Sequence, residues 1–160
     1  MSHRQRLLVL ALTTLSLCAL PASAAETRKV DDQGKSPRDA IRTPDTVKNR
    51  IVIQINEDDS KKWNATLTSI RNIQADLGPK NVKITVVAIS YGLGMLTADS
   101  LTATGVQDAL AAGVEFVACG NSMKAQNVAQ DDLVSGVSIA KAGYVELMKR
   151  QQQGWAYLRP

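Results

Sequence analysis

The sequence predicts an α/β fold in which a mostly parallel sheet is covered by helices on both faces. Short apolar runs rich in Val and Ile alternate along the chain with segments whose apolar residues recur at helical spacing. The apolar runs are nearly continuous, which is typical of strands that are buried on both faces of a parallel sheet. We therefore expect layers of helices on either side of a central sheet.

A strand and a helix open the predicted fold. The β-branched run 51–55 favours a strand, and the turn-forming residues 56–60 end it. Apolar side chains then recur at helical spacing from Trp63 onward, until Gly78 and Pro79 stop the helix.

The remainder of the chain continues this alternation. Apolar runs favour strands, and Gly113 and Gly154 close two of the helices. The predicted elements are, in chain order, a strand at 82–89, a glycine loop at 91–95, a helix at 100–112, a strand at 114–118, a short helix at 122–127, a fourth strand at 137–140, a helix at 143–153 and a last strand at 155–158.

The loops after the first three strands form the candidate site. In a parallel sheet with right-handed crossovers, these loops meet at one edge of the sheet, where α/β proteins bind ligands. The loops are 56–60, 90–95 and 119–122. The candidate residues are Cys119 as the reactive group and Asn56, Gly92, Gly94, Gly120, Asn121, Ser122 and Lys124 as ligand-binding groups.

The N-terminal residues have the pattern of a secretory signal peptide. Arg4 and Arg6 precede an apolar run at 8–20, and an Ala-x-Ala cleavage site ends at Ala24. A retained membrane anchor is the alternative, but the apolar run is shorter than the roughly 20 residues that a spanning helix needs. We therefore expect removal of residues 1–24, a periplasmic location, and no membrane attachment of the mature chain.

The expected mature chain consists of a linker and one domain. Residues 25–49 are polar, with few large apolar groups, and predict a flexible linker. Residues 50–160 suffice for one α/β domain. Of the chain's 19 basic residues, 17 remain after the two signal arginines are removed, which against 15 acidic residues gives a net charge of +2. The basic residues are scattered and aromatic residues are few, so nothing indicates binding to nucleic acid.

The expected mature chain has no histidine and one cysteine, Cys119, because His3 and Cys18 lie in the signal peptide. Without histidine, Ser-His-Asp and Cys-His catalysis and His-rich metal sites are excluded, and we expect neither a metal nor a cofactor. A thiol can still exchange sulfur, with its thiolate stabilised by amides at a helix start and by Lys124. Cys119 itself has three interpretations: a buried inert thiol, a reactive thiol, or half of an intermolecular disulfide.

Two other motifs have simple structural interpretations. The three acids at 57–59 suit a hard cation, but a cap on the helix that follows is the stronger interpretation. Gly92 and Gly94 lack the spacing of a phosphate-binding loop, so we interpret them as a tight turn that leaves space beside Cys119.

Three segments together resemble the DsrE/DsrF-like family of small sulfur-relay proteins. They are the segment 114–123 around Cys119, the helix that contains Trp63, and the C-terminal residues 152–160. The resemblance spans about residues 50–160.

This resemblance implies a three-layer α/β/α fold with a mostly parallel five-stranded sheet, and assembly into trimers or hexamers. It also implies a strand-end cysteine that carries persulfide sulfur between partner proteins, and Cys119 matches that cysteine. The family's sulfur-relay members are typically cytoplasmic, whereas this chain has an export signal. The expected partners are a sulfur donor protein and an acceptor protein.

Two functions follow from the sequence. The first is a periplasmic sulfur-binding or sulfur-transfer protein that uses Cys119 as a persulfide carrier. The alternative is a non-catalytic oligomeric module that binds a small ligand or a partner, with a structural cysteine. The reactivity of the thiol in the native protein distinguishes the two.

Overall fold

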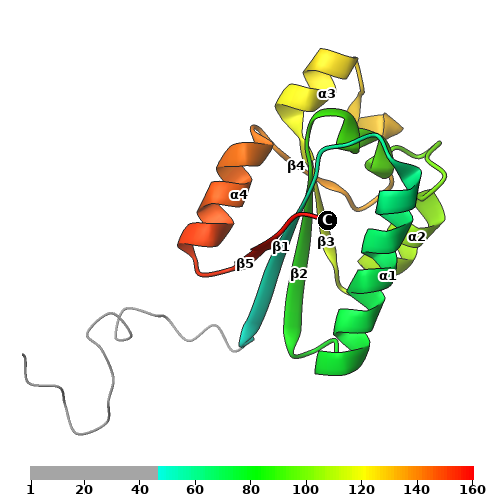
Figure 1. The fold of residues 1–160 in the computed structure, drawn as a ribbon. Helices are drawn as coiled ribbons and strands as arrows, with labels where there is room; N and C mark the ends of the chain where they lie inside the picture. The colour runs from blue at the N-terminus through cyan, green and yellow to red at the C-terminus, as the bar shows by residue number, and fades with distance from the viewer. Residues whose placement is uncertain (1–46) are drawn as a thin grey trace, which may run out of the picture. The chain divides into compact units, whose positions relative to one another are not determined.

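The structure is a computed structural model that describes residues 47–160. In this part of the chain, five strands form one sheet with helices on both of its faces (Figure 1). The predicted signal peptide and nearly all of the predicted linker lie outside the described residues. Among the residues that are described, no helix is long and apolar enough to cross a membrane.

The five strands of the sheet follow the chain order from one side to the other, except that the last strand lies beside the first. Its strands are β1 (Asn49–Ile55), β2 (Val82–Ala88), β3 (Glu115–Cys119), β4 (Ser138–Ala140) and β5 (Ala156–Leu158). All strand pairs are parallel, in the order β4-β3-β2-β1-β5. The chain therefore builds outward from β1 to β4 and then returns to add β5 beside β1.

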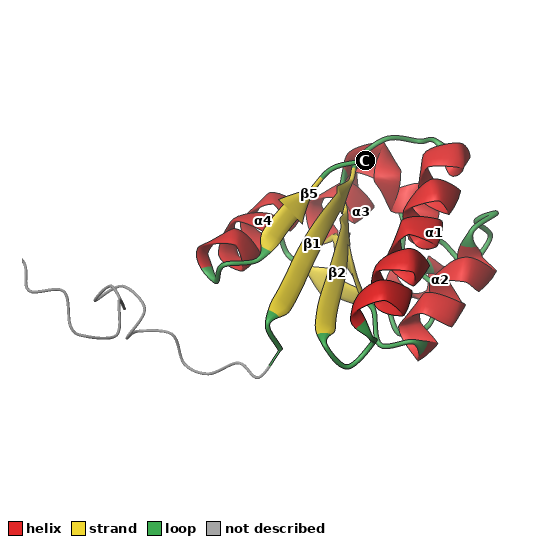
Figure 2. Ribbon diagram, turned by 60° about the horizontal axis from the view of Figure 1, so that its bottom comes forward, coloured by secondary structure: helices red, strands yellow, loops and turns green. Residues whose placement is uncertain are grey.

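The helices lie in two layers. They are α1 (Ser60–Leu77), α2 (Ala103–Ala111), α3 (Gly120–Gln126) and α4 (Gly143–Gln152), with two 3-10 segments, η2 (Ser90–Leu96) and η3 (Gln130–Asp132). Helices α1 and α2 cover one face of the sheet and α4 covers the other (Figure 1, Figure 2). Right-handed crossovers explain this, because the connection that returns to β5 must pass on the opposite face from those that advance toward β4. The predicted three-layer α/β/α fold is confirmed.

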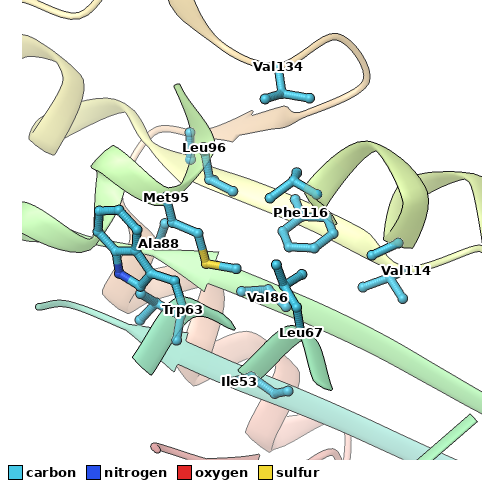
Figure 3. Packing of buried hydrophobic residues seen from close by; sticks show 14 of the residues in the cluster. Ile53, Trp63, Leu67, Val86, Ala88, Met95, Leu96, Val114, Phe116 and Val134 are labelled. Carbon is cyan, nitrogen blue, oxygen red and sulfur yellow. The ribbon is translucent and has the colours of Figure 1, made fainter. Parts of the chain in front are cut away.

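The three strands β1, β2 and β3 each divide their side chains between two cores. Successive residues of a strand point to opposite faces, so Phe116 joins the large core beneath α1 and α2, whereas Cys119 faces α4. Figure 3 shows the large core, with Trp63 and Phe116 among its side chains. The smaller core consists of Val52, Val87, Ile89, Val117, Cys119, Leu147 and Trp155.

Arg150 anchors the second half of α4 to the sheet. Its guanidinium donates hydrogen bonds to Glu146 (2.7 Å), Glu115 (3.0 Å) and Thr85 (3.1 Å). It also lies over the Trp155 ring, 4.6 Å from the ring centroid. These contacts fix the position of α4 across the sheet, and with it the position of the helix N-terminus.

The structure corrects the predicted loop at 91–95. Residues Ser90–Leu96 form the 3-10 helix η2, which is largely buried. A buried segment must pair its backbone groups inside the protein, and bonds such as Gly92 N–H to the Ile89 carbonyl (3.0 Å) do so. Glycine is required at position 92, because an added Cβ would lie 2.5 Å from the carbonyl oxygen of Ile55.

Several element boundaries also differ from the prediction by one to three residues; helix α2, for example, begins at Ala103 and not at residue 100. Strand β1 begins at Asn49, the last residue of the predicted linker, because Asn49 pairs with Val82 of β2. Helix α3 begins at Gly120, two residues earlier than predicted, so that it follows β3 without an intervening loop.

Candidate functional site

Cys119 is the last residue of β3 and the N-cap of α3. The strand turns its side chain toward α4, and only 5% of the residue is exposed. The prediction that this cysteine joins the end of a strand to the start of a helix is confirmed. Its thiol is therefore fixed by the sheet and is close to solvent only on one side.

The N-terminus of α4 reaches the sulfur of Cys119. Gly143, the first residue of α4, donates its backbone N–H to Sγ at 3.2 Å. Free amides at a helix N-terminus favour a negative charge. Only glycine permits this approach, because a Cβ at position 143 would overlap the side chain of Ile89 and come within 3.0 Å of the Cys119 Cβ.

Ser122 links the sulfur to a turn at Ser90. The Ser122 Oγ accepts a hydrogen bond from the Ser90 N–H at 2.7 Å. Its hydroxyl lies close enough to the Cys119 sulfur to lower the pKa of that thiol. Ser90 has a φ of 50°, in the left-handed region that residues other than glycine rarely adopt. Gln126 donates to the Ser90 carbonyl at 2.8 Å. Two residues of α3 thus hold this turn in place.

Opposing effects act on the pKa of the Cys119 thiol. Burial raises the pKa, but hydrogen bonds to the sulfur outweigh burial. The Ser122 hydroxyl lowers the pKa most, followed by the backbone amides of Gly143, Ser122 and Asn121, so that the pKa lies below its ordinary value. The nucleophilic thiolate is therefore more populated at neutral pH than in a free cysteine.

An open hollow of about 410 Å³ adjoins the sulfur. Tyr91 of η2 and Tyr144 of α4 line it, and both side chains are largely exposed. None of the described residues in the lining is Asp, Glu, Lys, Arg or His, so dipoles and not full charges surround the thiol. The lining consists of Ile89, Ser90, Tyr91, Cys119, Asn121, Ser122, Ala125, Gln126, Ala142, Gly143 and Tyr144.

Four residues predicted near the cysteine separate into two places. Asn121 and Ser122 line the hollow beside Cys119. Gly120 and Lys124 line a different open hollow, of about 580 Å³, which α3 shares with β4. The groups that lower the pKa of the Cys119 thiol are the Ser122 hydroxyl and the nearby backbone amides, and Lys124 is not among them.

The other three predicted residues lie away from the thiol hollow. The Asn56 Oδ1 accepts a hydrogen bond from Arg159 at 3.1 Å, and Asn56 lines a small cavity beside Trp63. Gly92 packs against the backbone of β1, and a Cβ at Gly94 would lie 3.1 Å from the Trp63 ring. The two glycines therefore provide close packing of η2.

The sequence interpretation did not single out Tyr91, Gln126, Gly143 or Tyr144 as site residues. The last two belong to α4, which returns across the sheet and reaches Cys119 from the opposite face. The available signal for these two residues was Gly143, a glycine at the predicted start of a helix. That this glycine lies next to Cys119 depends on the strand order, which the sequence pattern does not contain.

The acids at 57–59 stabilise the start of α1. The Asp59 side chain accepts hydrogen bonds from the N–H groups of Lys61 (2.9 Å) and Lys62 (3.1 Å), so the capping interpretation is confirmed. Glu57 pairs with Lys62, whose hydrogen bond and charge lower the pKa of that carboxyl. Within residues 47–160, no group of three or more His, Cys, Asp or Glu side chains is placed to hold a metal ion.

Comparison with known proteins defines the class of this fold and site. Residues 81–160 match the model of the DsrE/DsrF-like family. A structure of a protein of unknown function from Methanobacterium thermoautotrophicum is 38% identical, with a TM-score of 0.67, and the match covers 70% of this chain and 99% of that one. The chain belongs to the DsrE/DsrF-like family. No protein with a curated description matches the sequence.

Two further solved structures share the fold at lower identity. A conserved protein of unknown function from Bacteroides thetaiotaomicron is 16% identical, with a TM-score of 0.59 over 70% of this chain and 95% of that one. The ychN protein from E. coli is 17% identical, with a TM-score of 0.60 over 70% of this chain and 99% of that one. Family membership suggests a role related to sulfur relay.

Proposed function

We propose that this protein is a periplasmic sulfur carrier in which Cys119 accepts a sulfur atom as a persulfide and passes it to a partner. The main support is the environment of the sulfur, where the Gly143 amide donates to Sγ and the Ser122 hydroxyl lowers the pKa of the thiol. A thiolate beside an open hollow meets the first requirement of thiol exchange. The family match supports the same role.

Loading and discharge are two nucleophilic displacements at sulfur. In loading, the Cys119 thiolate attacks the outer sulfur of a donor persulfide, and the donor's sulfur–sulfur bond breaks. The donor thiolate leaves with the electron pair, and the outer sulfur, with its proton, becomes bonded to Sγ. In discharge, an acceptor thiolate attacks that outer sulfur and Sγ leaves as a thiolate. The sulfur is transferred with no net oxidation.

The cysteine content of the chain requires that the other thiols come from elsewhere. The only cysteine besides Cys119 is Cys18, in the predicted signal peptide. The exported chain then has no second thiol to resolve a persulfide into an internal disulfide. Donor and acceptor are therefore separate molecules.

We extend the proposal to a homo-oligomer, a trimer or a hexamer. Helix α4 exposes three large apolar side chains on one surface, those of Tyr144, Val145 and Met148. Clustered exposed apolar groups are typical of interaction surfaces. Assembly through α4 would place subunit contacts beside the thiol hollow, because Tyr144 lines it.

One observation favours a second candidate function. Cys119 is nearly buried and belongs to an apolar core, as structural cysteines commonly do. In this alternative the protein is a binding module, and its hollow holds a small ligand or a partner segment while the thiol stays inert. Reaction of the native protein with a thiol reagent as fast as a free thiol supports the carrier; protection until denaturation supports the module.

Mass measurement after incubation with a persulfide donor tests the carrier directly. The purified exported protein should gain about 32 Da per chain, the mass of one sulfur atom, and a dithiol reductant should remove it. Cys119→Ser should show no gain while remaining folded. If the wild-type protein stays unmodified although its thiol is reduced, the carrier function is wrong and the binding module replaces it.

A further inference from the structure

The hydrogen-bond donors at Cys119 lie around Sγ and not around a second sulfur atom bonded to it. Their position therefore determines whether they stabilise the unloaded thiolate or the loaded persulfide. In the free thiolate, the negative charge is on Sγ, where the Gly143 amide lies 3.2 Å away. In the loaded state, any charge is on the outer sulfur, one bond further from these donors. Donors to Sγ therefore favour the unloaded thiolate, which is both the nucleophile of loading and the leaving group of discharge.

We propose, resting on the sulfur-carrier function, that Ser122 is a positioning residue that keeps more of Cys119 as the thiolate needed for loading and makes Cys119 a better leaving group, with its hydroxyl oriented by the Ser90 turn. The Ser90 N–H occupies a lone pair of the Ser122 Oγ at 2.7 Å. A hydroxyl that accepts on one side has its single hydrogen free to donate on the other. The acceptor on that other side is the sulfur of Cys119, which lines the same hollow as Ser122.

Two side chains of α3 hold the Ser90 turn in the position from which its N–H orients the Ser122 hydroxyl. Ser122 and Gln126 are four residues apart on α3 and thus share a helix face. Ser122 accepts from the Ser90 N–H, and Gln126 donates to the Ser90 carbonyl at 2.8 Å. Both polar groups of a residue with unfavourable φ are bound by one helix, so the turn and the serine hydroxyl form one unit.

Full charges do not replace Ser122 at the sulfur. Besides Cys119, the titratable side chains that line the hollow are the phenols of Tyr91 and Tyr144. The charged residues on the strands, helices and connection packed around the thiol lie outside the hollow lining. They are Lys83, Glu115, Lys124, Lys141, Glu146, Lys149 and Arg150.

Two rates measure the two roles of Ser122. The first is alkylation of the unloaded thiol as a function of pH, and the second is discharge of the loaded protein to a small thiol in excess. Ser122→Ala should move the alkylation profile to higher pH, with a several-fold loss in rate below its midpoint. A hydrogen bond to a charged group is removed, so less thiolate is present, and its higher basicity offsets only part of that loss. Discharge should slow several-fold because a more basic thiolate leaves more slowly.

The variants include a rescue and a matched control. Ser122→Thr keeps the hydroxyl and should restore both rates. Ser69→Ala removes an exposed serine hydroxyl that donates to the Ala65 carbonyl on α1, and it should change neither rate. Gln126→Ala releases the Ser90 turn without touching Sγ, and should shift the alkylation profile in the same direction by a smaller amount.

The outcomes separate this inference from the carrier function. If folded Ser122→Ala alkylates and discharges like the wild-type protein, the inference is wrong even where loading succeeds. If Ser122→Ala does not fold, the Gln126→Ala profile decides, and an unshifted profile overturns the inference. If the wild-type protein takes up no sulfur, the carrier function fails and the leaving-group role of Ser122 fails with it. The alkylation profile then still shows whether Ser122 positions the thiolate.

Discussion

The absence of one methyl group at Gly143 allows α4 to contact the reactive sulfur. The Gly143 N–H donates to Sγ, and the Cα lies so close to β2 and β3 that a side chain would collide with Ile89 and Cys119. The thiol pKa is lowered partly by this amide. The packing and the chemistry of the site therefore depend on the same residue.

Gly143→Ala should uncouple α4 from the sulfur. The added methyl must push the start of the helix outward, which costs about 1–3 kcal/mol of stability as overpacking and lengthens the N–H···S bond. The pKa of Cys119 should rise, and thiol alkylation should shift to higher pH. Urea denaturation and the pH profile of alkylation measure the two effects.

Gly105→Ala is the matched control for that change. A Cβ at Gly105, on α2, would lie 2.8 Å from the Leu67 side chain in the other core. This variant introduces strain of the same kind without a contact to the sulfur. Its alkylation profile should match that of the wild-type protein. A profile shifted as far as that of Gly143→Ala would show that general loosening, and not the lost amide, controls the thiol.

Helix α1 owes its starting point to a cap in the acidic turn. Asp59 accepts from two N–H groups of the first turn, and the helix then supplies Trp63 and Leu67 to the large core. The cap satisfies orphan donors that would otherwise need water. The cap in the acidic turn therefore determines the residue at which α1 begins to pack on the large core.

Asp59→Ala should destabilise the domain by about 1 kcal/mol, because two N–H groups of α1 lose their acceptor. Urea denaturation of the folded protein measures the loss. Asp58→Ala removes the same charge from an exposed neighbour and should cost much less, while Asp59→Asn should retain most of the stability. Equal losses from Asp58→Ala and Asp59→Ala would attribute the effect to charge and contradict the cap.

The two faces of the sheet are covered unequally. In the described part of the chain, α1 and α2 pack on one face, whereas α4 alone lies on the other and exposes the apolar side chains of Tyr144, Val145 and Met148. The edge strand β5 is exposed along its length. A further copy of the chain against α4 would bury the side chains that this single helix leaves in water.

Light scattering of the exported protein at micromolar concentration should show an assembly larger than a dimer. Met148→Glu, which changes one of the three exposed apolar residues of α4, should dissociate the assembly, because a buried unpaired carboxylate is unfavourable. Leu101→Glu replaces a more exposed apolar residue near the start of α2 and should leave the assembly intact. A wild-type monomer would contradict the proposed assembly.

The fold could be predicted because its signals are local. The run 51–55 and the Trp63 periodicity each depend on neighbours along the chain, and both elements are present. The prediction of a loop at 91–95 was wrong, because the segment is buried against β1 and forms a 3-10 helix. Its glycines do not indicate such a helix. Burial by distant residues is not visible in a local pattern.

The α/β class, the parallel sheet and the placement of Cys119 between a strand and a helix all follow from local patterns in the sequence. Which groups lie around the sulfur of Cys119 depends on the three-dimensional packing. Ser122 lies three residues away on α3, whereas Ser90 and Gly143 are brought to it by β2 and by the return of α4 across the sheet. The physical reason is that strand order and helix packing bring together groups far apart in sequence, and no local spacing records them. Lys124, the nearest cation in the sequence, therefore lines a different hollow, while neutral donors surround the thiol.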